Sequence, residues 1–324
     1  MQCANNLKNL GLAMQTYHGS NKQFPEALQM PQFFLNSGDH QILIKSTRLF
    51  ANWTVKLLPY IEQQTLYDQF AANGRIDVAD IATTSELGGA LSMRAGAVKE
   101  LRGTQLNVMI CPSDPFSLQR FEEDGGNWAR ANYAINGGLG FITQFDNWWN
   151  GIGLSSACAR GVATVNNGAS IRTITDGTSN TIALAELRAG LSPRDRRGVW
   201  AMGMVGSSVH EEHGSNNVNT LNSCGSGDED IFGASDIIAD VGEATLLSEC
   251  MMPDRGYQFS AQSVVRSVHP GGVFVAMCDG SVQFISDFID AGAQTAGLRC
   301  DEEDYGVWQR LNGSNDAMTL EGAF

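Results

Sequence analysis

Basic residues are scarce in this sequence. Only five of the 324 residues are lysine, and the formal net charge is −14. A nucleic-acid surface needs a basic stripe, and anionic lipid headgroups attract lysine and arginine. We therefore expect neither nucleic acid nor an anionic membrane surface among the partners of this chain.

Long apolar runs and the commonest catalytic motifs are missing too. No stretch of about 18 apolar residues occurs, so the chain as given is not expected to span a membrane. Its first residues do not form a signal peptide. The sequence contains no G-x-S-x-G, no Walker A loop and no G-x-G-x-x-G after an expected strand. No nucleophile with its base can be named, so the sequence favours a protein that is not an enzyme.

The strongest metal-like motif is VHEEHG at 209–214. A zincin helix needs histidines four residues apart, whereas His210 and His213 are three apart and lie among glycines and serines. We interpret Glu211, Glu212 and both histidines as part of a solvated loop. A metal-dependent enzyme that uses His210, Glu211 and His213 is kept as the least favoured alternative.

A second acidic segment, GSGDEDIFGASDIIAD at 225–240, offers oxygen donors in a glycine-rich context. Its spacing departs from the EF-hand loop, which ends in a bidentate glutamate at position 12. We therefore predict no cofactor and treat Ca²⁺ as a minor alternative. The acidic residues in question are Asp228, Glu229, Asp230, Asp236 and Asp240.

The seven cysteines show no C-x-x-C spacing. In an exported protein they allow up to three disulfides and one remaining thiol. We expect at least one disulfide within the set from 111 to 300, and we expect Cys3 to stay free or to link subunits. The set comprises Cys111, Cys158, Cys224, Cys250, Cys278 and Cys300.

Hydrophobic periodicity predicts an α+β fold. The first 24 residues form an amphipathic helix with an apolar stripe, which Gly19 and Pro25 end. Two helical pieces bent at Pro59 follow over 52–70, then a helix over 77–102. Apolar segments at 106–116, 131–140, 181–187 and 198–206 predict strands. The helix stripe consists of Leu7, Leu10, Met14 and Tyr17.

The segment SVHPGGVFVAMCDGSVQFISD, 267–287, predicts a β-hairpin. Asp279-Gly280 is typical of a two-residue turn, and folding about it places Met277 opposite Val282 and Val275 opposite Phe284. The alternatives for His269 and Asp279 are an acid–base couple and a pair of metal ligands. We favour a structural role for both, and the role of His269 is the less settled.

Seven segments occur in an order that resembles one family. They are QCANNLKNLGLAMQTYH, FP at 24–25, LLPYIEQQTLY, CPSD, NYAINGG, ITDGTSNTIALAE and the terminal H-x9-DG. Together they resemble the DUF1559 proteins of planctomycetes, which are type IV pilin-like proteins with a prepilin-type leader. The resemblance runs from Gln2 to about Ile289.

The resemblance implies a pilin-like helix (1–24) packed on the antiparallel sheet of a globular part (25–324) that carries the hairpin 269–285 and long inserted loops. It also implies an apolar helix upstream of Gln2, which this sequence does not include, so polymers of the chain as given would need contacts between globular parts. We expect a non-enzymatic structural subunit, extracellular or at the cell surface, that assembles with itself. The first alternative is a polysaccharide-binding module that uses Trp128, Trp148 and Trp149.

Overall fold

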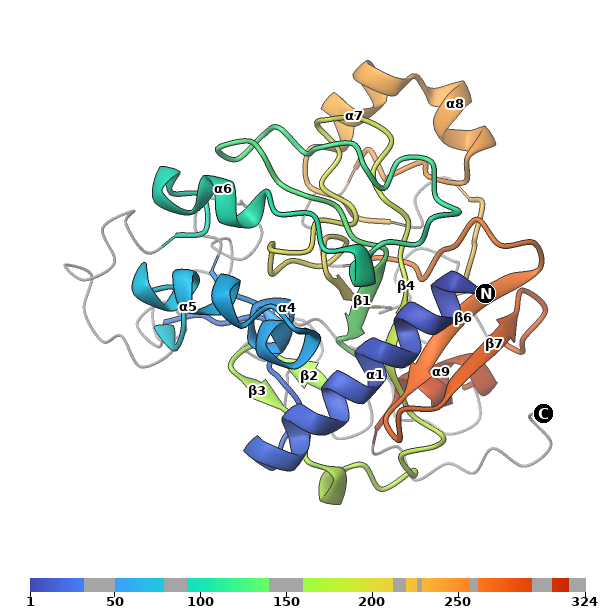
Figure 1. The fold of residues 1–324 in the computed structure, drawn as a ribbon. Coiled ribbons are helices and arrows are strands. Elements are labelled where there is room, and N and C mark those ends of the chain that lie inside the picture. Colours follow the sequence, from blue (N-terminus) through green and yellow to red (C-terminus); the bar gives the residue numbers. More distant parts are fainter. Residues whose placement is uncertain are drawn as a thin grey trace.

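The computed structural model describes residues 1–31, 50–78, 92–139, 160–211, 220–225, 229–256, 262–292 and 305–314. The fold is α+β, as the sequence predicts: an N-terminal helix, α1 (Gln2–Asn21), contacts a five-stranded sheet, and long irregular segments connect the elements. Figure 1 shows α1 lying across the sheet beside the β6–β7 hairpin.

The sheet has the strand order β5-β1-β4-β6-β7. Its strands are β1 (Tyr133–Asn136), β4 (Ile182–Glu186), β5 (Val209–His210), β6 (Gly272–Met277) and β7 (Val282–Ser286). Every neighbouring pair is antiparallel except β1 and β5, which are parallel. A separate small hairpin pairs β2 (Ala163–Thr164) with β3 (Asn167–Gly168). The predicted strands at 131–140 and 181–187 are thus confirmed.

The remaining helices are short. The α-helices are α4 (Trp53–Leu57), α5 (Gln64–Ala72), α6 (Lys99–Arg102), α7 (Ala234–Val241), α8 (Glu243–Ser248) and α9 (Val307–Asn312). The 3₁₀ turns are η1 (Leu58–Ile61), η3 (Gly96–Val98), η4 (Asn107–Met109) and η6 (Ile171–Thr173). The bent helical pair over 52–70 is confirmed as α4, η1 and α5. None of the described helices combines the length and the apolarity that crossing a bilayer requires.

Three sequence predictions of secondary structure were wrong. The helix expected over 77–102 is α-helical only from Lys99 among its described residues; a 3₁₀ turn precedes it, and the Arg102 guanidinium donates to the carbonyls of Met93 and Ala95. The strand expected over 106–116 is a 3₁₀ turn followed by tight turns. The strand expected over 198–206 is a series of turns, since Gly198 and Gly206 both take positive φ.

The sheet is covered on both faces. The predicted apolar stripe of α1 is buried, with Leu7 and Leu10 fully inaccessible, and it shares a core with Ala276 and Cys278. On the other face Val273 and Val275 pack with Trp308 of α9. Figure 1 shows α9 behind the β6–β7 hairpin, opposite α1. This double covering explains why all five residues of β4 are buried, and it places a carboxyl group, that of Glu186, in the interior.

The hairpin forms where the sequence predicts it, but the predicted register was wrong by one residue. Ala276 pairs with Val282 and Phe274 with Phe284. The loop has three residues rather than two: Met277 donates its N–H to the Ser281 carbonyl, and Gly280 takes a φ of +81°. The observed register directs Phe274, Ala276 and Val282 toward the core that contains α1.

Candidate functional site at the base of the first helix

Four segments far apart in the sequence bring one titratable or thiol-derived group each to the first turn of α1. Cys3 comes from α1, Cys111 from the loop after η4, Glu186 from the last position of β4, and His269 from the turn before β6. Their sulfur, oxygen and nitrogen atoms all lie within 4.8 Å of one another. We call these four residues the helix-anchoring cluster.

Cys3 and Cys111 form a disulfide across 108 residues of sequence. The expectation that Cys3 stays free or links subunits was therefore wrong. The reason is tertiary: the first turn of α1 lies against the 107–111 segment, where the Asn6 amide donates to the Ile110 carbonyl at 2.6 Å.

Cys224 and Cys250 form a second disulfide, which confirms a bond within the predicted set. Cys278 is a free, buried thiol, and burial raises its pKa. Cys158 and Cys300 lie outside the described residues. Because disulfides persist in oxidising compartments, the two bonds indicate an extracytoplasmic location.

Glu186 is an almost inaccessible carboxyl group, with 1% of its surface exposed. Its Oε1 lies 3.1 Å from His269 Nε2, and its Oε2 accepts the Phe274 backbone N–H at 2.8 Å. Burial raises the pKa of Glu186 to about 8, although the Phe274 N–H partly opposes this rise. The folded protein thus favours the neutral acid at neutral pH.

His269 is mostly buried and is held from several sides. Its backbone N–H donates to Ser267 Oγ at 3.0 Å, and its ring meets the Phe274 ring edge to face at 5.2 Å. Its Nε2 also lies 3.6 Å from Cys111 Sγ. Burial lowers the pKa of His269, and the N-terminal ammonium adds to this effect.

The partner of His269 is therefore Glu186 and not Asp279. The carboxylate of Asp279 accepts the Ser281 N–H at 2.8 Å and belongs to the hairpin loop, which confirms its predicted turn role. Sequence reasoning missed Glu186. The available signal was a carboxyl group at the end of the otherwise apolar run TIALAE, where an acid on a buried strand needs a partner.

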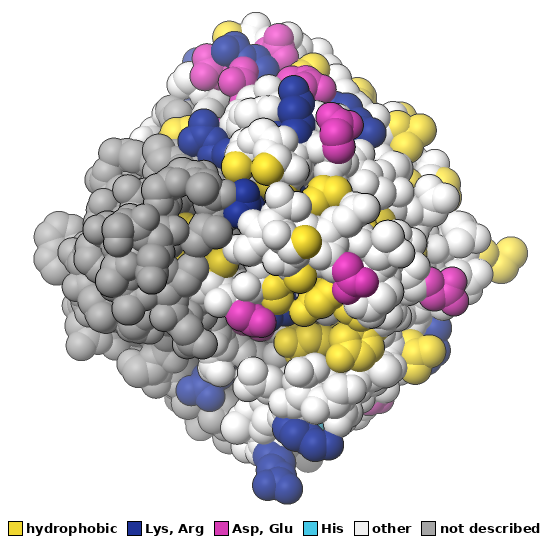
Figure 2. Space-filling model, turned by 60° about the vertical axis from the view of Figure 1, so that its left-hand side comes forward, with side chains coloured by type: hydrophobic (Ala, Val, Ile, Leu, Met, Phe, Trp, Pro, Cys, Tyr) yellow, Lys and Arg dark blue, Asp and Glu magenta, His cyan; other side chains and the backbone are white. Residues whose placement is uncertain are grey.

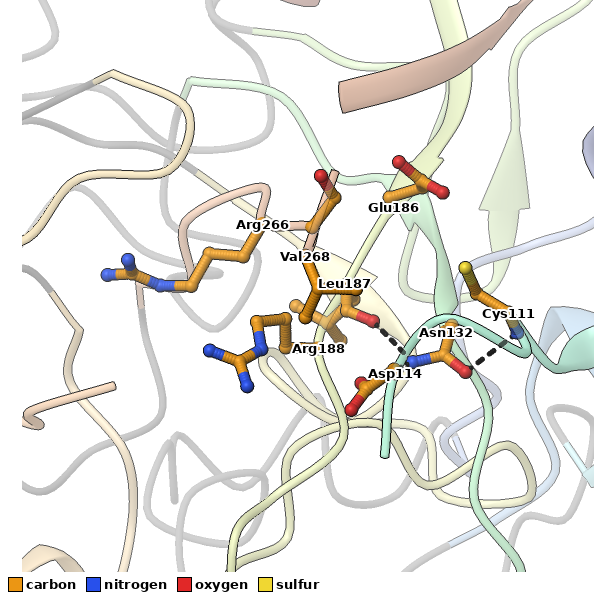
Figure 3. A pocket seen from close by; sticks show the side chains of 9 residues that line it. Cys111, Asp114, Asn132, Glu186, Leu187, Arg188, Arg266 and Val268 are labelled. Carbon is orange, nitrogen blue, oxygen red and sulfur yellow. Dashed lines mark hydrogen bonds between the residues drawn. The ribbon is translucent and has the colours of Figure 1, made fainter. Parts of the chain in front are cut away.

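Asn132 organises a pocket of about 10 Å³ behind the cluster, about the space that one water needs. Its Oδ1 accepts the Cys111 N–H at 2.9 Å, and its Nδ2 donates to Asp114 at 2.7 Å. Arg188 and Arg266 also line this pocket, yet Figure 3 shows both guanidinium groups extending away from Glu186 and Cys111. Arg188 instead pairs with Glu249 at 2.9 Å.

A second polar group, the arginine cluster, comprises Arg130, Asp195, Arg197, Glu229 and Arg266. Arg197 bridges both acids, with N–O distances of 2.6 Å to Asp195 and 2.6 Å to Glu229, and all three side chains are inaccessible. Burial alone would raise the pKa of Asp195, but Arg197 and Arg130 outweigh burial and lower it. Sequence reasoning missed this cluster, although the charged run SPRDRRG between apolar segments was a signal.

The acidic segment at 225–240 does not form one oxygen-lined loop in its described part. Glu229 is committed to Arg197, and Arg266 Nε lies 3.5 Å from the same carboxylate. Asp236 and Asp240 instead lie on α7. Asp228 is outside the described residues.

The prediction that VHEEHG forms a solvated loop was wrong for His210 and Glu211, the two residues of its HEEH part that the structure describes. Both are fully buried, although β5, which contains His210, is the edge strand that pairs with β1. Among the described residues neither ring nitrogen of His210 has a hydrogen-bond partner, and burial lowers its pKa to about 3. Glu212 and His213 lie outside the described residues.

Trp128, one of the three tryptophans considered for sugar binding, is fully buried, with the Arg102 guanidinium 4.5 Å from its ring centroid. It therefore cannot stack on a sugar. Trp148 and Trp149 lie outside the described residues.

Comparison with known proteins gives one family. Residues 1–292 match SBP_bac_10, described as "Protein of unknown function (DUF1559)". Neither the curated proteins nor the solved structures contain a match to the chain. The family match covers α1, the whole five-stranded sheet and all four members of the helix-anchoring cluster. The chain belongs to the DUF1559 family.

Proposed function

We propose that this protein is a non-enzymatic, extracytoplasmic structural subunit of pilin-like type, which assembles with copies of itself. The observation that carries the proposal is the attachment of α1 to the globular part. The Cys3–Cys111 disulfide ties the first turn of the helix covalently to a loop more than 100 residues away. A helix fixed in this way holds the globular part at one orientation to anything joined to its N-terminal end.

Polar contacts continue this attachment along the helix. The Tyr133 hydroxyl donates to the Cys3 carbonyl at 3.1 Å, and Lys8 donates to the Gly280 carbonyl at 2.9 Å. About two turns further on, Gln15 donates to the Cys278 carbonyl. Gly11 faces the hairpin loop, since a Cβ at this position would be in van der Waals contact with Gly280 Cα at 3.4 Å. Helix and sheet therefore behave as one rigid unit, which favours a structural role.

The surface charge sets the conditions for assembly. Figure 2 shows acidic and basic side chains interspersed at the upper end of one face, with apolar side chains gathered lower down. At a net charge of −14, however, whole subunits repel one another at long range. Salt screens this repulsion, so assembly should increase between low and moderate ionic strength. A head-to-tail contact that does not close on itself gives a filament or tube.

The test is light scattering and negative-stain microscopy of the oxidised protein at low and moderate salt. We expect ordered homomeric assemblies that grow with salt. The variant Cys3→Ser should assemble less well because α1 is no longer covalently held, whereas the matched variant Cys224→Ser should assemble normally. A protein that stays monomeric at both salt concentrations, up to high protein concentration, overturns the proposal.

A further inference from the structure

We propose that the helix-anchoring cluster is a zinc site when its disulfide is reduced, with Cys3, Cys111, His269 and Glu186 as the four ligands. The disulfide and the metal would be alternative occupants of the same two sulfur atoms. In either state the first turn of α1 would stay joined to the 111 loop. This inference stands apart from the proposed assembly, since it concerns the inside of one subunit.

The donor set fits Zn²⁺. Zinc prefers four-coordinate, tetrahedral sites built from thiolate sulfur, imidazole nitrogen and carboxylate oxygen. At ordinary zinc–ligand distances the donor atoms of such a site are roughly 3.3–3.8 Å apart. His269 Nε2 already lies 3.6 Å from Cys111 Sγ and 3.1 Å from Glu186 Oε1. The largest change required is separation of the two bonded sulfurs.

The four donors are held by contacts that do not depend on the disulfide. The Phe274 N–H fixes the Glu186 carboxylate, and the Phe274 ring packs against the His269 imidazole. On the cysteine side, Asn132 accepts the Cys111 N–H, and Tyr133 donates to the Cys3 carbonyl. Such supporting contacts orient metal ligands and strengthen binding. Reduction should therefore leave the donors close to their present positions.

The charges near the cluster are mixed, since Asp114 favours a cation and the N-terminal ammonium opposes one. The pocket arginines, Arg188 and Arg266, pair with Glu249 and Glu229, and their guanidinium groups extend away from Glu186 (Figure 3). In the arginine cluster, by contrast, Arg197 pairs with both buried acids, and Arg130 and Arg266 supply further positive charge. The helix-anchoring cluster thus combines a carboxyl group with two sulfurs that become anionic on metal binding, and it receives no direct guanidinium contact among the described residues.

The chemistry balances with a dithiol as reductant. The dithiol gives two electrons and two protons to the Cys3–Cys111 bond and is itself oxidised to a disulfide. Zn²⁺ then replaces the protons of the two cysteine thiols and of the Glu186 carboxyl group, and three protons are released to solvent. A disulfide oxidant takes two electrons from the two thiolates and is itself reduced to two thiolates, which releases the metal and restores the Cys3–Cys111 bond.

The experiment uses the full chain with Cys224→Ser and Cys250→Ser, which removes the second described disulfide. The protein is reduced with dithiothreitol, freed of reductant without air, and titrated with Co²⁺ as a spectroscopic probe. We expect one equivalent to give near-ultraviolet sulfur-to-cobalt bands and the visible bands of a tetrahedral site, all abolished by Zn²⁺. The oxidised protein should give neither set of bands.

Variants identify the ligands. Cys3→Ser should abolish the sulfur-to-cobalt bands of the one-equivalent site, and His269→Ala should weaken Co²⁺ affinity at least about 10-fold. The isosteric Glu186→Gln should alter the visible bands while the protein stays folded by circular dichroism. Cys278→Ala is the matched control and should change nothing, because its thiol lies at the hairpin loop. Absence of tetrahedral cobalt bands in the reduced protein, or affinity unchanged by His269→Ala, overturns the proposal.

Discussion

The helix-anchoring cluster and the arginine cluster both bury carboxyl groups, but they neutralise them differently. In the arginine cluster Arg197 lies 2.6 Å from both Asp195 and Glu229, and Arg130 and Arg266 complete the balance of charge. In the helix-anchoring cluster Glu186 has the Phe274 N–H and a histidine whose pKa is lowered. One acid is therefore held as a carboxylate, Asp195, and the other as a neutral acid, Glu186.

This difference distinguishes a structural site, whose charges are already paired, from a site whose donor atoms are available to a metal ion. A buried ion pair is already satisfied, so removing one partner leaves a charge that the interior cannot solvate. A neutral acid beside imidazole and sulfur can instead lose its proton when a cation arrives. Residue type alone does not distinguish the two, since both clusters mix acids with basic side chains.

The largest expected effect comes from breaking the arginine cluster. Arg197→Met leaves Asp195 and Glu229 buried without their cation and should lower the free energy of unfolding by about 3–5 kcal/mol. The matched variant is Arg194→Met, whose half-exposed side chain pairs with Glu123 at 3.1 Å and should cost no more than about 1 kcal/mol. Urea unfolding measures both. Equal costs would contradict the role given to Arg197.

Next comes loss of the covalent part of the helix-anchoring cluster. Cys3→Ser opens a loop closed across 108 residues and should cost about 2–5 kcal/mol in oxidised protein. Cys224→Ser opens a separation of only 26 residues, so its cost should be about 1 kcal/mol smaller. Urea unfolding with and without reductant compares them. Under reducing conditions each variant should approach the reduced parent, and a difference that survives reduction would argue against this account.

The third prediction uses the pH dependence of stability to distinguish the helix-anchoring cluster from the arginine cluster. The folded-state pKa of Glu186, about 8, is above its ordinary 4.5, so the group stabilises the protein at low pH and this contribution is lost as pH rises toward 8. Between pH 5 and 7 the free energy of unfolding should fall by about 2–3 kcal/mol. Glu186→Gln, which resembles the neutral acid, should abolish this dependence of the free energy of unfolding on pH.

The measurement is urea unfolding of oxidised protein at pH 5, 6 and 7, with a chelator present. Glu229→Gln is the matched control. It should destabilise the protein throughout this range, because Glu229 balances Arg197 as a carboxylate. Parallel pH profiles for the parent and Glu186→Gln would show that Glu186 does not titrate as described.

The smallest expected effect concerns the hairpin loop against which α1 packs. Gly280 has a φ of +81°, and a Cβ there would have only ordinary contacts, the nearest at 3.5 Å from Gln15 Cγ. Gly280→Val should therefore cost about 1–2 kcal/mol through backbone strain alone. Gly280→Asn tolerates this conformation better and should cost less. Thermal unfolding distinguishes the two variants. Equal losses of stability would indicate steric crowding by the side chain instead of backbone strain.

Local sequence patterns were sufficient for several elements. The stripe of Leu7, Leu10, Met14 and Tyr17 predicts both α1 and its buried face, because helical periodicity directly reports which side is apolar. The apolar segments around β1 and β4 likewise predict strands. Asp279-Gly280 predicts a hairpin, but a loop of two residues and one of three share this signal, so its register was not determined locally.

The sequence by itself determined the α+β class, the helix face and the existence of the hairpin, since each depends on neighbours within a few residues. Only the tertiary structure decided that Cys3 meets Cys111 and that Glu186 meets His269. These pairs are separated by 108 and 83 residues, and they form because α1, the loop after η4, the end of β4 and the turn before β6 meet at one place in the fold. Such contacts depend on how whole elements pack, and no local periodicity contains that information.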